Sequence, residues 1–380
     1  MLLPPEIREP LPGTLRQGRW GRVQRLDAVQ GLRAVAAWFV VIAHGALWAG
    51  GFGSLILPAR SYELLGSLGV LMFFTVSGFI MVYISRGTFG MPGASVSFLQ
   101  KRLIRIVPLY WMMTMLALVI ILRNAQPVGM VQVMQSLLFI PYIVHGHLIR
   151  PLLGVGWTLN FEMFFYVLFA VSLLVRRGLM LLCCTLGVLL LTDQILNPIW
   201  HYHDPSTLVQ EWTDPLLLPF LLGIGLAILH KSYPAMHNRH PFLGLAAGCL
   251  VMLVLQQTLI PDHHDPVWWR IAVLALGAVL ASSAILASGH LEVPRWLILA
   301  GDSSYSLYLV HPLLFGLVKR IGGEALAREL PVAAMLLYVV LSTAAGLALH
   351  ICIERPLTRW LGRRLPRAEP PKARLEVAAA

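Results

Sequence analysis

Apolar stretches of about 20 residues recur along this chain from end to end. Each is long enough to cross the roughly 30 Å hydrocarbon core of a bilayer as a helix. They are residues 28–48, 64–84, 105–122, 154–175, 179–196, 213–230, 241–260, 267–287, 296–318 and 331–353. Because every backbone polar group must be paired within the hydrocarbon, such stretches form helices. The sequence therefore predicts an all-α, polytopic membrane helical bundle with about ten transmembrane helices.

The charged residues point to the same class of protein. Only 12% of the 380 residues are charged and 57% are hydrophobic, whereas an ordinary soluble domain has about 25% charged residues. Most basic residues lie in alternate connections and at the ends, in 8–25, 86–105, 176–177, 231–240 and 355–367. By the positive-inside rule, both termini are expected in the cytoplasm. The net charge of +11 thus signals topology, and no nucleic-acid partner is expected.

The spans leave no separate soluble domain. We expect a basic cytoplasmic tail at 1–25, a transmembrane domain at 26–357 and a second basic tail at 358–380. Residues 123–153 contain "GMVQVMQSLLFIPYIV", which is too short and too polar to span, and predict a re-entrant or interfacial helix on the outer side. The four cysteines lack the spacing of metal ligands, so we expect neither a metal site nor a disulfide.

Two ionisable residues stand out on the first span, in "RAVAAWFVVIAH". Arg33 and His44 are eleven residues apart, which on a helix is about 16 Å and nearly the same face. A charge at the bilayer centre costs about 2.5–3.5 kcal/mol, so such residues usually have a function. Arginine binds phosphate through a permanent charge and a planar fork, and histidine titrates near neutrality. The spacing fits a phosphate anchor and a reaction centre for an acyl-coenzyme A, although a coupled ion pathway could use the same residue types.

Six motifs then occur in order along the chain. They are "LDAVQGLRAVAAWFVVIAH", "GVLMFFTVSGFIMVY", "FLQKRLIRIVPLYW", "GVGWTLNFEMFFYVLF", "LAGDSSYSLYLVHP" and "IERPLTRW". With these motifs, residues 26–357 resemble the acyltransferase 3 family of bacterial integral membrane O-acyltransferases, and within it the exopolysaccharide-modifying branch. The resemblance implies transfer of an acyl group, most often acetyl, from cytosolic acyl-coenzyme A (acetyl-CoA) to a carbohydrate hydroxyl. The acceptor would be a polysaccharide or its lipid-linked precursor, and the protein would lie in the bacterial inner membrane.

The resemblance also implies roles for individual residues. His44 corresponds to the essential histidine of the family, and Arg33 to its motif partner. Arg102 and Arg105 correspond to the basic pair of a cytoplasmic loop, with the phosphates of coenzyme A as their expected ligand. The structural alternative for this pair is the ordinary positive-inside signal, which binds anionic lipid.

Glu162, in "GVGWTLNFEMFFY", is the expected partner of His44. A hydroxyl must lose its proton as it attacks a thioester, and a positioned general base contributes about 10²–10⁴-fold. His44 is the natural base, and a carboxylate at similar depth would fix its tautomer and stabilise the imidazolium. The alternative for Glu162 is a hydrogen bond from its protonated form to a neighbouring helix.

Three further residues are expected to contact the acceptor. His311 and Tyr305 lie in a hydroxyl-rich segment, and Trp157 could stack on a sugar ring. The structural alternatives are hydrogen bonds that hold helices together and an aromatic belt at the membrane interface.

Two other functions remain open at this level. A secondary transporter also places ionisable residues in the membrane, although such proteins are often built from repeated halves, and none is visible here. A non-catalytic subunit of a polysaccharide synthesis and export complex is the second alternative. Consumption of acetyl-CoA by membranes that contain the protein would separate the enzyme from both.

Overall fold

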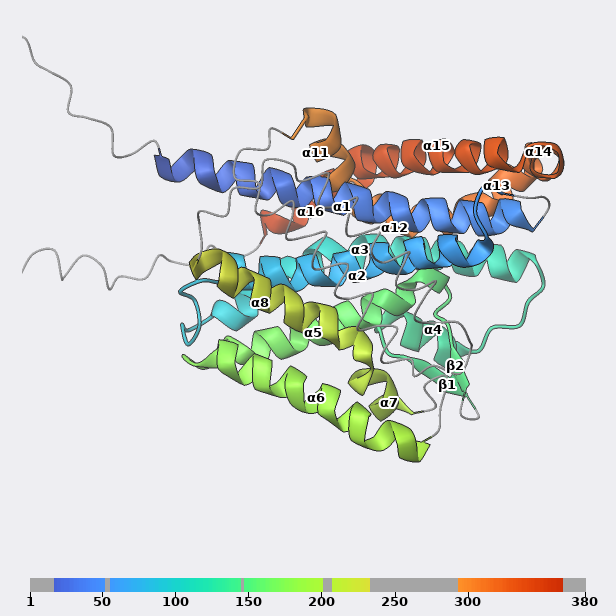
Figure 1. Cartoon of the computed structure of the whole chain (residues 1–380). Coiled ribbons are helices and arrows are strands. Elements are labelled where there is room, and N and C mark those ends of the chain that lie inside the picture. The colour runs from blue at the N-terminus through green and yellow to red at the C-terminus, as the bar shows by residue number, and fades with distance from the viewer. Residues whose placement is uncertain (1–16, 52–54, 145–146, 201–206, 233–292, 365–380) are drawn as a thin grey trace, which may run out of the picture.

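The computed structural model is built from long helices packed side by side (Figure 1), and it describes residues 17–51, 55–144, 147–200, 207–232 and 293–364. The N-terminal part contains α1 (Gln17–Gly50), α2 (Ala59–Ile84), α3 (Ala94–Arg123), α4 (Met130–Leu137), β1 (Tyr142–Val144), β2 (His147–Ile149), α5 (Trp157–Ser172), α6 (Gly178–Trp200), α7 (Leu208–Thr213) and α8 (Leu218–Ser232). The C-terminal part contains α11 (Arg295–Asp302), α12 (Ser304–Val310), α13 (Phe315–Arg320), α14 (Gly323–Glu329), α15 (Pro331–Leu349) and α16 (Arg355–Gly362). The described residues also contain four short turns, namely η1 (Gly154–Gly156), η2 (Pro215–Leu217), η3 (His311–Leu314) and the π-helical η4 (His350–Glu354).

Seven stretches of the described residues are long and apolar enough to cross a membrane. They are Asp27–Gly50, Ala59–Ile84, Ala94–Arg123, Gly154–Ser172, Gly178–Leu196, Leu208–Leu229 and Pro331–Gly362. Each overlaps one of the ten expected spans, which confirms a polytopic helical bundle. The expected spans 241–260 and 267–287 lie outside the described residues.

The expected span 296–318 differs from a single straight helix. It is divided into α11, α12, η3 and α13. At the first break, the hydroxyl of Ser303 donates to the carbonyl of Ala300 at 3.1 Å, a local bond that competes with continued helix. At the second break, Pro312 lacks an amide hydrogen and cannot continue the regular pattern.

Residues 123–153 also hold more than the expected helix. Only the first part of "GMVQVMQSLLFIPYIV" is helical, as α4, and β1 pairs antiparallel with β2 so that Tyr142 lies opposite Ile149. Pro141 disfavours the helical conformation of the residue before it, and the following Tyr-Ile-Val sequence favours a strand. The interfacial, outer position of this segment stays a prediction.

One end of the bundle gathers the basic connections. The α2–α3 and α5–α6 connections lie at the left in Figure 1, where α1 also begins. Arg86, Arg176 and Arg177 belong to these two connections. The positive-inside rule predicts that this end faces the cytoplasm.

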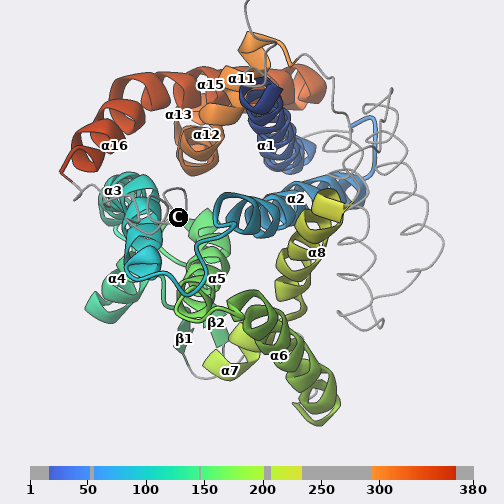
Figure 2. The same cartoon turned by 90° about the vertical axis from the view of Figure 1, so that its left-hand side faces the viewer.

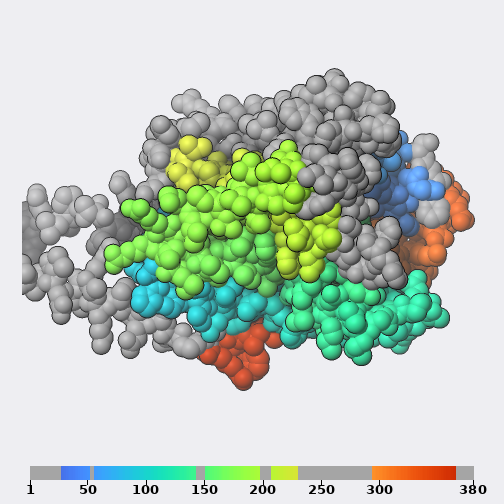
Figure 3. Space-filling view, turned by 90° about the horizontal axis from the view of Figure 1, so that it is seen from below, coloured from blue at the N-terminus to red at the C-terminus, as the bar shows by residue number. Residues whose placement is uncertain are grey.

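Apolar side chains on the outside of α6 mark a surface for lipid. This helix covers much of the face seen in Figure 3. Its exposed side chains include Met180, Val188, Leu191 and Ile195, each more than 60% exposed. A soluble monomer rarely exposes a contiguous apolar patch of this kind, so the face fits hydrocarbon.

Helices α2 and α8 approach closely through two glycines. A Cβ atom on Gly78 would lie 2.2 Å from the carbonyl oxygen of Phe220, and one on Gly223 would lie 2.1 Å from that of Thr75. Small residues let membrane helices pack with their backbones in contact. Beside this crossing, the Phe220 ring stacks on Phe74 and Phe165, with centroids 4.5 and 4.4 Å away. The crossing therefore fixes how α2 and α8 pack against each other inside the bundle.

We expect Gly78→Ala to lower the thermal unfolding temperature of the detergent-solubilised protein. The added methyl group must push α8 away, and overpacking of this kind costs about 1–3 kcal/mol. Gly225→Ala is the matched control, because a Cβ atom there meets nothing within 4 Å. Equal unfolding temperatures for the two variants would contradict the close crossing.

The last long helix buries a stripe with a four-residue spacing. The buried residues of α15 are Ala334, Tyr338, Ser342 and Gly346. The stripe continues into the π turn, where Glu354 is buried. Its Oε2 accepts hydrogen bonds from Ser306 Oγ at 2.6 Å and from His350 Nδ1 at 2.8 Å. These bonds tie the end of the stripe to α12.

Candidate active site

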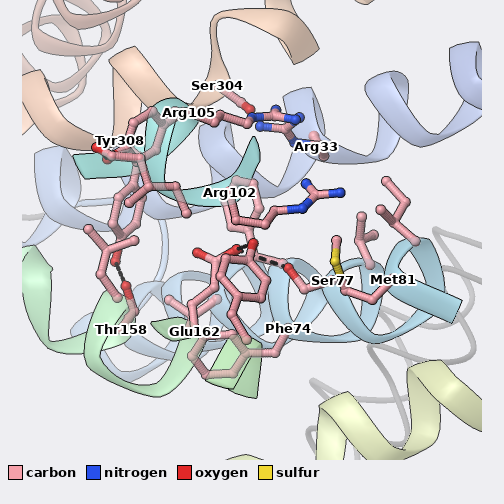
Figure 4. A pocket seen from close by; sticks show the side chains of 18 residues that line it. Arg33, Phe74, Ser77, Met81, Arg102, Arg105, Thr158, Glu162, Ser304 and Tyr308 are labelled. Carbon is pink, nitrogen blue, oxygen red and sulfur yellow. Dashed lines mark hydrogen bonds between the residues drawn. The ribbon is translucent and has the colours of Figure 1, made fainter. Parts of the chain in front are cut away.

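A cavity of about 90 Å³ opens between α1, α2, α3, α5 and α12. Figure 2 shows these five helices around a common centre, and Figure 4 shows the lining side chains. The polar residues that line it are Arg33, Ser77, Arg102, Arg105, Thr158, Glu162, Tyr166, Ser304, Tyr305 and Tyr308. We call this space the arginine cavity.

Three guanidinium groups are directed into the arginine cavity (Figure 4). Arg33 comes from α1, and its Nη1 donates to Oε1 of Gln30 at 3.3 Å. Arg102 comes from α3, where its guanidinium group lies 5.9 Å from the ring centroid of Tyr166. Arg105 lies one turn further along α3, and its charge interacts unfavourably with that of Arg33. The structure thus brings together the three residues expected to bind phosphate.

Glu162 faces the three arginines from α5. Among the described residues that line the cavity, it is the one carboxylate. Its Oε1 accepts hydrogen bonds from Ser77 Oγ at 3.1 Å and from the hydroxyl of Tyr166 (Figure 4). Three cations and one carboxylate leave an excess of positive charge inside the bundle, which is costly unless an anion binds there.

His44 and His311 lie against one another. Their ring centroids are 5.0 Å apart, with the planes at 65°. Each Nδ1 lies at hydrogen-bonding distance from the main-chain carbonyl four residues earlier, 2.9 Å from Val40 and 3.2 Å from Leu307. A carbonyl can only accept, so each Nδ1 carries the hydrogen and each Nε2 is left as a proton acceptor.

Nε2 of His311 is fully buried and has no hydrogen-bond partner within the described part of the chain. A buried polar atom of this kind usually needs a partner. A substrate hydroxyl beside the two rings would supply one. Neither histidine is among the described residues that line the arginine cavity, so the two imidazoles form a separate centre further along α1.

The remaining expected residues have structural contacts of their own. Tyr305 lines the arginine cavity, and its hydroxyl donates to the carbonyl of Ile106 at 2.7 Å. Trp157 begins α5 and meets Phe161 edge-on, with centroids 6.2 Å apart. The acceptor contacts of Tyr305, Trp157 and His311 stay predictions.

The role of Glu162 as the carboxylate that orients His44 also stays a prediction. The hydrogen bonds described for Glu162 come from Ser77 and Tyr166, and sequence reasoning missed both partners. Tyr166 is four residues after Glu162, a spacing that places two side chains on the same helix face. The spacing of Glu162 and Tyr166 therefore predicts this hydrogen bond from the sequence. Ser77 lies on another helix, and nothing local in the sequence connects it with Glu162.

Residues 26–351 match the family model of the acyltransferase domain. The chain belongs to this family. The resemblance to this family is thereby confirmed, and the protein is a multi-pass membrane O-acyltransferase. Family membership favours an enzyme over the transporter and the non-catalytic subunit.

Similarity to individual proteins extends over most of the chain. The exopolysaccharide production protein ExoZ of Rhizobium meliloti (strain 1021) is 33% identical over 301 residues, which cover 78% of this chain and 90% of that protein. Acyltransferase MdmB of Streptomyces mycarofaciens is 28% identical over 394 residues, which cover 92% of this chain and 96% of that protein. No solved structure shows significant similarity to the chain.

Proposed function

We propose that the protein transfers an acetyl group from cytosolic acetyl-CoA to a hydroxyl of an exported polysaccharide or its lipid-linked precursor, in the bacterial inner membrane. The observation that carries the proposal is the excess of positive charge in the arginine cavity, with a pair of proton-accepting imidazoles about 16 Å further along α1 from Arg33. The relative named for exopolysaccharide production supports a carbohydrate acceptor.

The arginine cavity suits the diphosphate of the donor. Each phosphate in that linkage carries a negative charge, which Arg33, Arg102 and Arg105 would balance. Planar guanidinium groups bind phosphate oxygens in pairs of hydrogen bonds. From Arg33 to His44 the distance along α1 is about 16 Å, comparable to the reach of the pantetheine arm. A donor held by its diphosphate therefore delivers its thioester to the histidines.

The chemistry follows from Nε2 of His44, which can accept a proton because Nδ1 carries the hydrogen. Nε2 accepts the proton of the sugar hydroxyl as the oxygen attacks the thioester carbonyl. The bond between the carbonyl carbon and sulfur then breaks, and the leaving thiolate takes the proton from the imidazolium. The products are the acetyl ester and coenzyme A. His311, in contact with His44, offers a second acceptor nitrogen to the incoming hydroxyl.

Mass spectrometry of cell-surface glycans, with and without the gene, tests the proposal. We expect ester-linked acetyl groups that disappear with the gene. Membranes that contain the protein should also release coenzyme A from isotopically labelled acetyl-CoA and place the label in alkali-labile glycan esters. Identical glycans in both strains, with no acetyl-CoA consumed, would contradict the proposal.

For Arg102→Ala and Arg105→Ala we expect the KM for acetyl-CoA to rise by about tenfold or more with a smaller change in kcat. Each variant removes charge-assisted hydrogen bonds worth about 1.5–3 kcal/mol, and phosphate contacts act on the ground state and the transition state alike. Lys101→Ala is the matched control, because this exposed lysine neighbours Arg102 on α3 without lining the cavity. An unchanged KM for acetyl-CoA in both arginine variants would leave Arg102 and Arg105 with the positive-inside role alone.

A further inference from the structure

A second pocket adjoins the arginine cavity, with a volume of about 300 Å³. We call it the α16 pocket, and it is lined by Gln30, Arg105, Asp302, His350, Glu354, Arg355, Thr358 and Arg359. Arg105 lines both spaces. Gln30, which lines the α16 pocket, accepts the hydrogen bond of Arg33, which lines the arginine cavity. The two spaces are therefore neighbours that share polar side chains.

Three arginines line the α16 pocket, from two different helices. Arg105 belongs to α3, whereas Arg355 and Arg359 are exposed residues one turn apart on α16. Of the two carboxylates, Glu354 already accepts hydrogen bonds from Ser306 and His350. Asp302 lies on the opposite wall, at the end of α11. An anion in this pocket is therefore attracted to the α3–α16 side and repelled from α11.

Close packing fixes the wall opposite α16. A Cβ atom on Gly301 would lie 2.0 Å from the carbonyl oxygen of Gln30, so α11 and α1 touch through their backbones. This contact holds Asp302 beside Gln30. Both side chains carry oxygen atoms that accept hydrogen bonds, which suits the hydroxyl and amino groups of a nucleoside.

Two parallel segments place the pockets in one order. Along α1, Gln30 of the α16 pocket comes about 4.5 Å before Arg33 of the arginine cavity, and His44 follows about 16 Å later. The second segment consists of α11, α12 and η3. Along it, Asp302 of the α16 pocket precedes Tyr305 of the arginine cavity, and His311 follows beside His44. The molecule thus presents a basic pocket, a basic cavity and a histidine pair in sequence.

An acyl-coenzyme A has its parts in the same order. A 3′-phosphorylated adenosine is followed by a diphosphate, an unbranched arm and the thioester. We propose that the α16 pocket binds the 3′-phosphoadenosine end of the donor, with Arg355 and Arg359 on the 3′-phosphate, and so makes the enzyme select donors that carry this phosphate. The inference rests on the proposed acyl-coenzyme A donor and adds the part of the site that reads the nucleotide.

Initial rates with two donors test the inference on the purified full-length protein. The donors are acetyl-CoA and acetyl-3′-dephospho-CoA, which differ in one phosphate. For the wild-type protein we expect kcat/KM to fall about tenfold or more without that phosphate. Arg355→Gln and Arg359→Gln should lower kcat/KM for acetyl-CoA by a similar factor and leave the dephospho donor nearly unchanged.

Two controls complete the experiment. Arg363→Gln makes the same charge change on an exposed residue next to α16 that does not line the pocket, and both donors should react as in the wild type. Binding without chemistry is measured by the thermal shift that adenosine 3′,5′-bisphosphate and adenosine 5′-monophosphate produce. The bisphosphate should give the larger shift in the wild type, and the difference should vanish in the Arg355 and Arg359 variants.

The outcomes separate this inference from the proposed function. Equal use of the two donors by the wild type would overturn the inference while the acyl-coenzyme A donor stands. Variants that slow both donors equally would assign the arginines to structure. Variants that keep the wild-type preference but lose activity on anionic lipid vesicles would assign them to a lipid headgroup, which also overturns the inference. No reaction with either donor would overturn the proposed function and the inference with it.

Discussion

The His44→Ala protein is expected to insert into the membrane normally and to transfer acetyl groups about 10²–10⁴-fold more slowly than the wild type. The variant removes the nitrogen that we propose accepts the hydroxyl proton. Its effect on folding should be small, because His44 is only partly buried and its described hydrogen bond goes to the carbonyl of its own helix. Initial rates of coenzyme A release, compared with the amount of folded protein in the membrane, measure the effect.

Leu47→Ala is the matched control for this experiment. Leu47 follows His44 by three residues on α1, and its side chain is 38% exposed. Its variant should keep nearly the wild-type rate. Rates within a few-fold of the wild type for His44→Ala would remove the base from the mechanism and leave His311 as the candidate.

Arg33→Ala should slow the reaction of acetyl-CoA at least about tenfold more than that of S-acetyl-pantetheine. The truncated donor lacks the nucleotide and the diphosphate, which is the group that we propose Arg33 binds. The wild type should in turn prefer the full donor strongly. Rates for both donors with both proteins give the coupling between Arg33 and the diphosphate, and a value above about 0.5 kcal/mol indicates contact.

If Arg33→Ala slows the reactions of the two donors equally, Arg33 contributes to packing between helices and not to donor binding. Its hydrogen bond to Gln30 would then be the main interaction of the side chain. Gln30→Ala helps to separate the cases, because it removes that bond and leaves the guanidinium group in the arginine cavity, although it also removes a side chain that lines the α16 pocket. We expect it to slow acetyl-CoA less than Arg33→Ala does.

The transmembrane spans and the arrangement of the first motif could be predicted from the sequence, because the membrane constrains each segment independently of its neighbours. A stretch such as 64–84 must be helical wherever it packs, since the hydrocarbon supplies no partners for its backbone. The placement of Arg33 and His44 on one face of α1 follows from helix geometry in the same way. Predictions of this kind need no knowledge of neighbouring helices.

The contacts between helices could not be read in this way. His44 and His311 are 267 positions apart, and only the packing of α1 against α12 brings their rings together. The same is true of Ser77 and Glu162, whose hydrogen bond joins α2 to α5. The first break within 296–318 depends on a competition between a serine hydroxyl and the helix, which a count of apolar residues does not include.

The π turn at His350–Glu354 affects how far α16 is rotated about the axis of α15. An α-helix turns by about 100° per residue, so a stripe of every fourth residue drifts by about 40° at each step. From Ala334 to Gly346 the buried stripe makes three such steps. A π turn holds more residues per turn and so reverses part of this drift. Glu354 consequently lies on the side of the helix that faces Ser306. The same rotation directs Arg355 and Arg359 of α16 toward Arg105 of α3 rather than toward lipid.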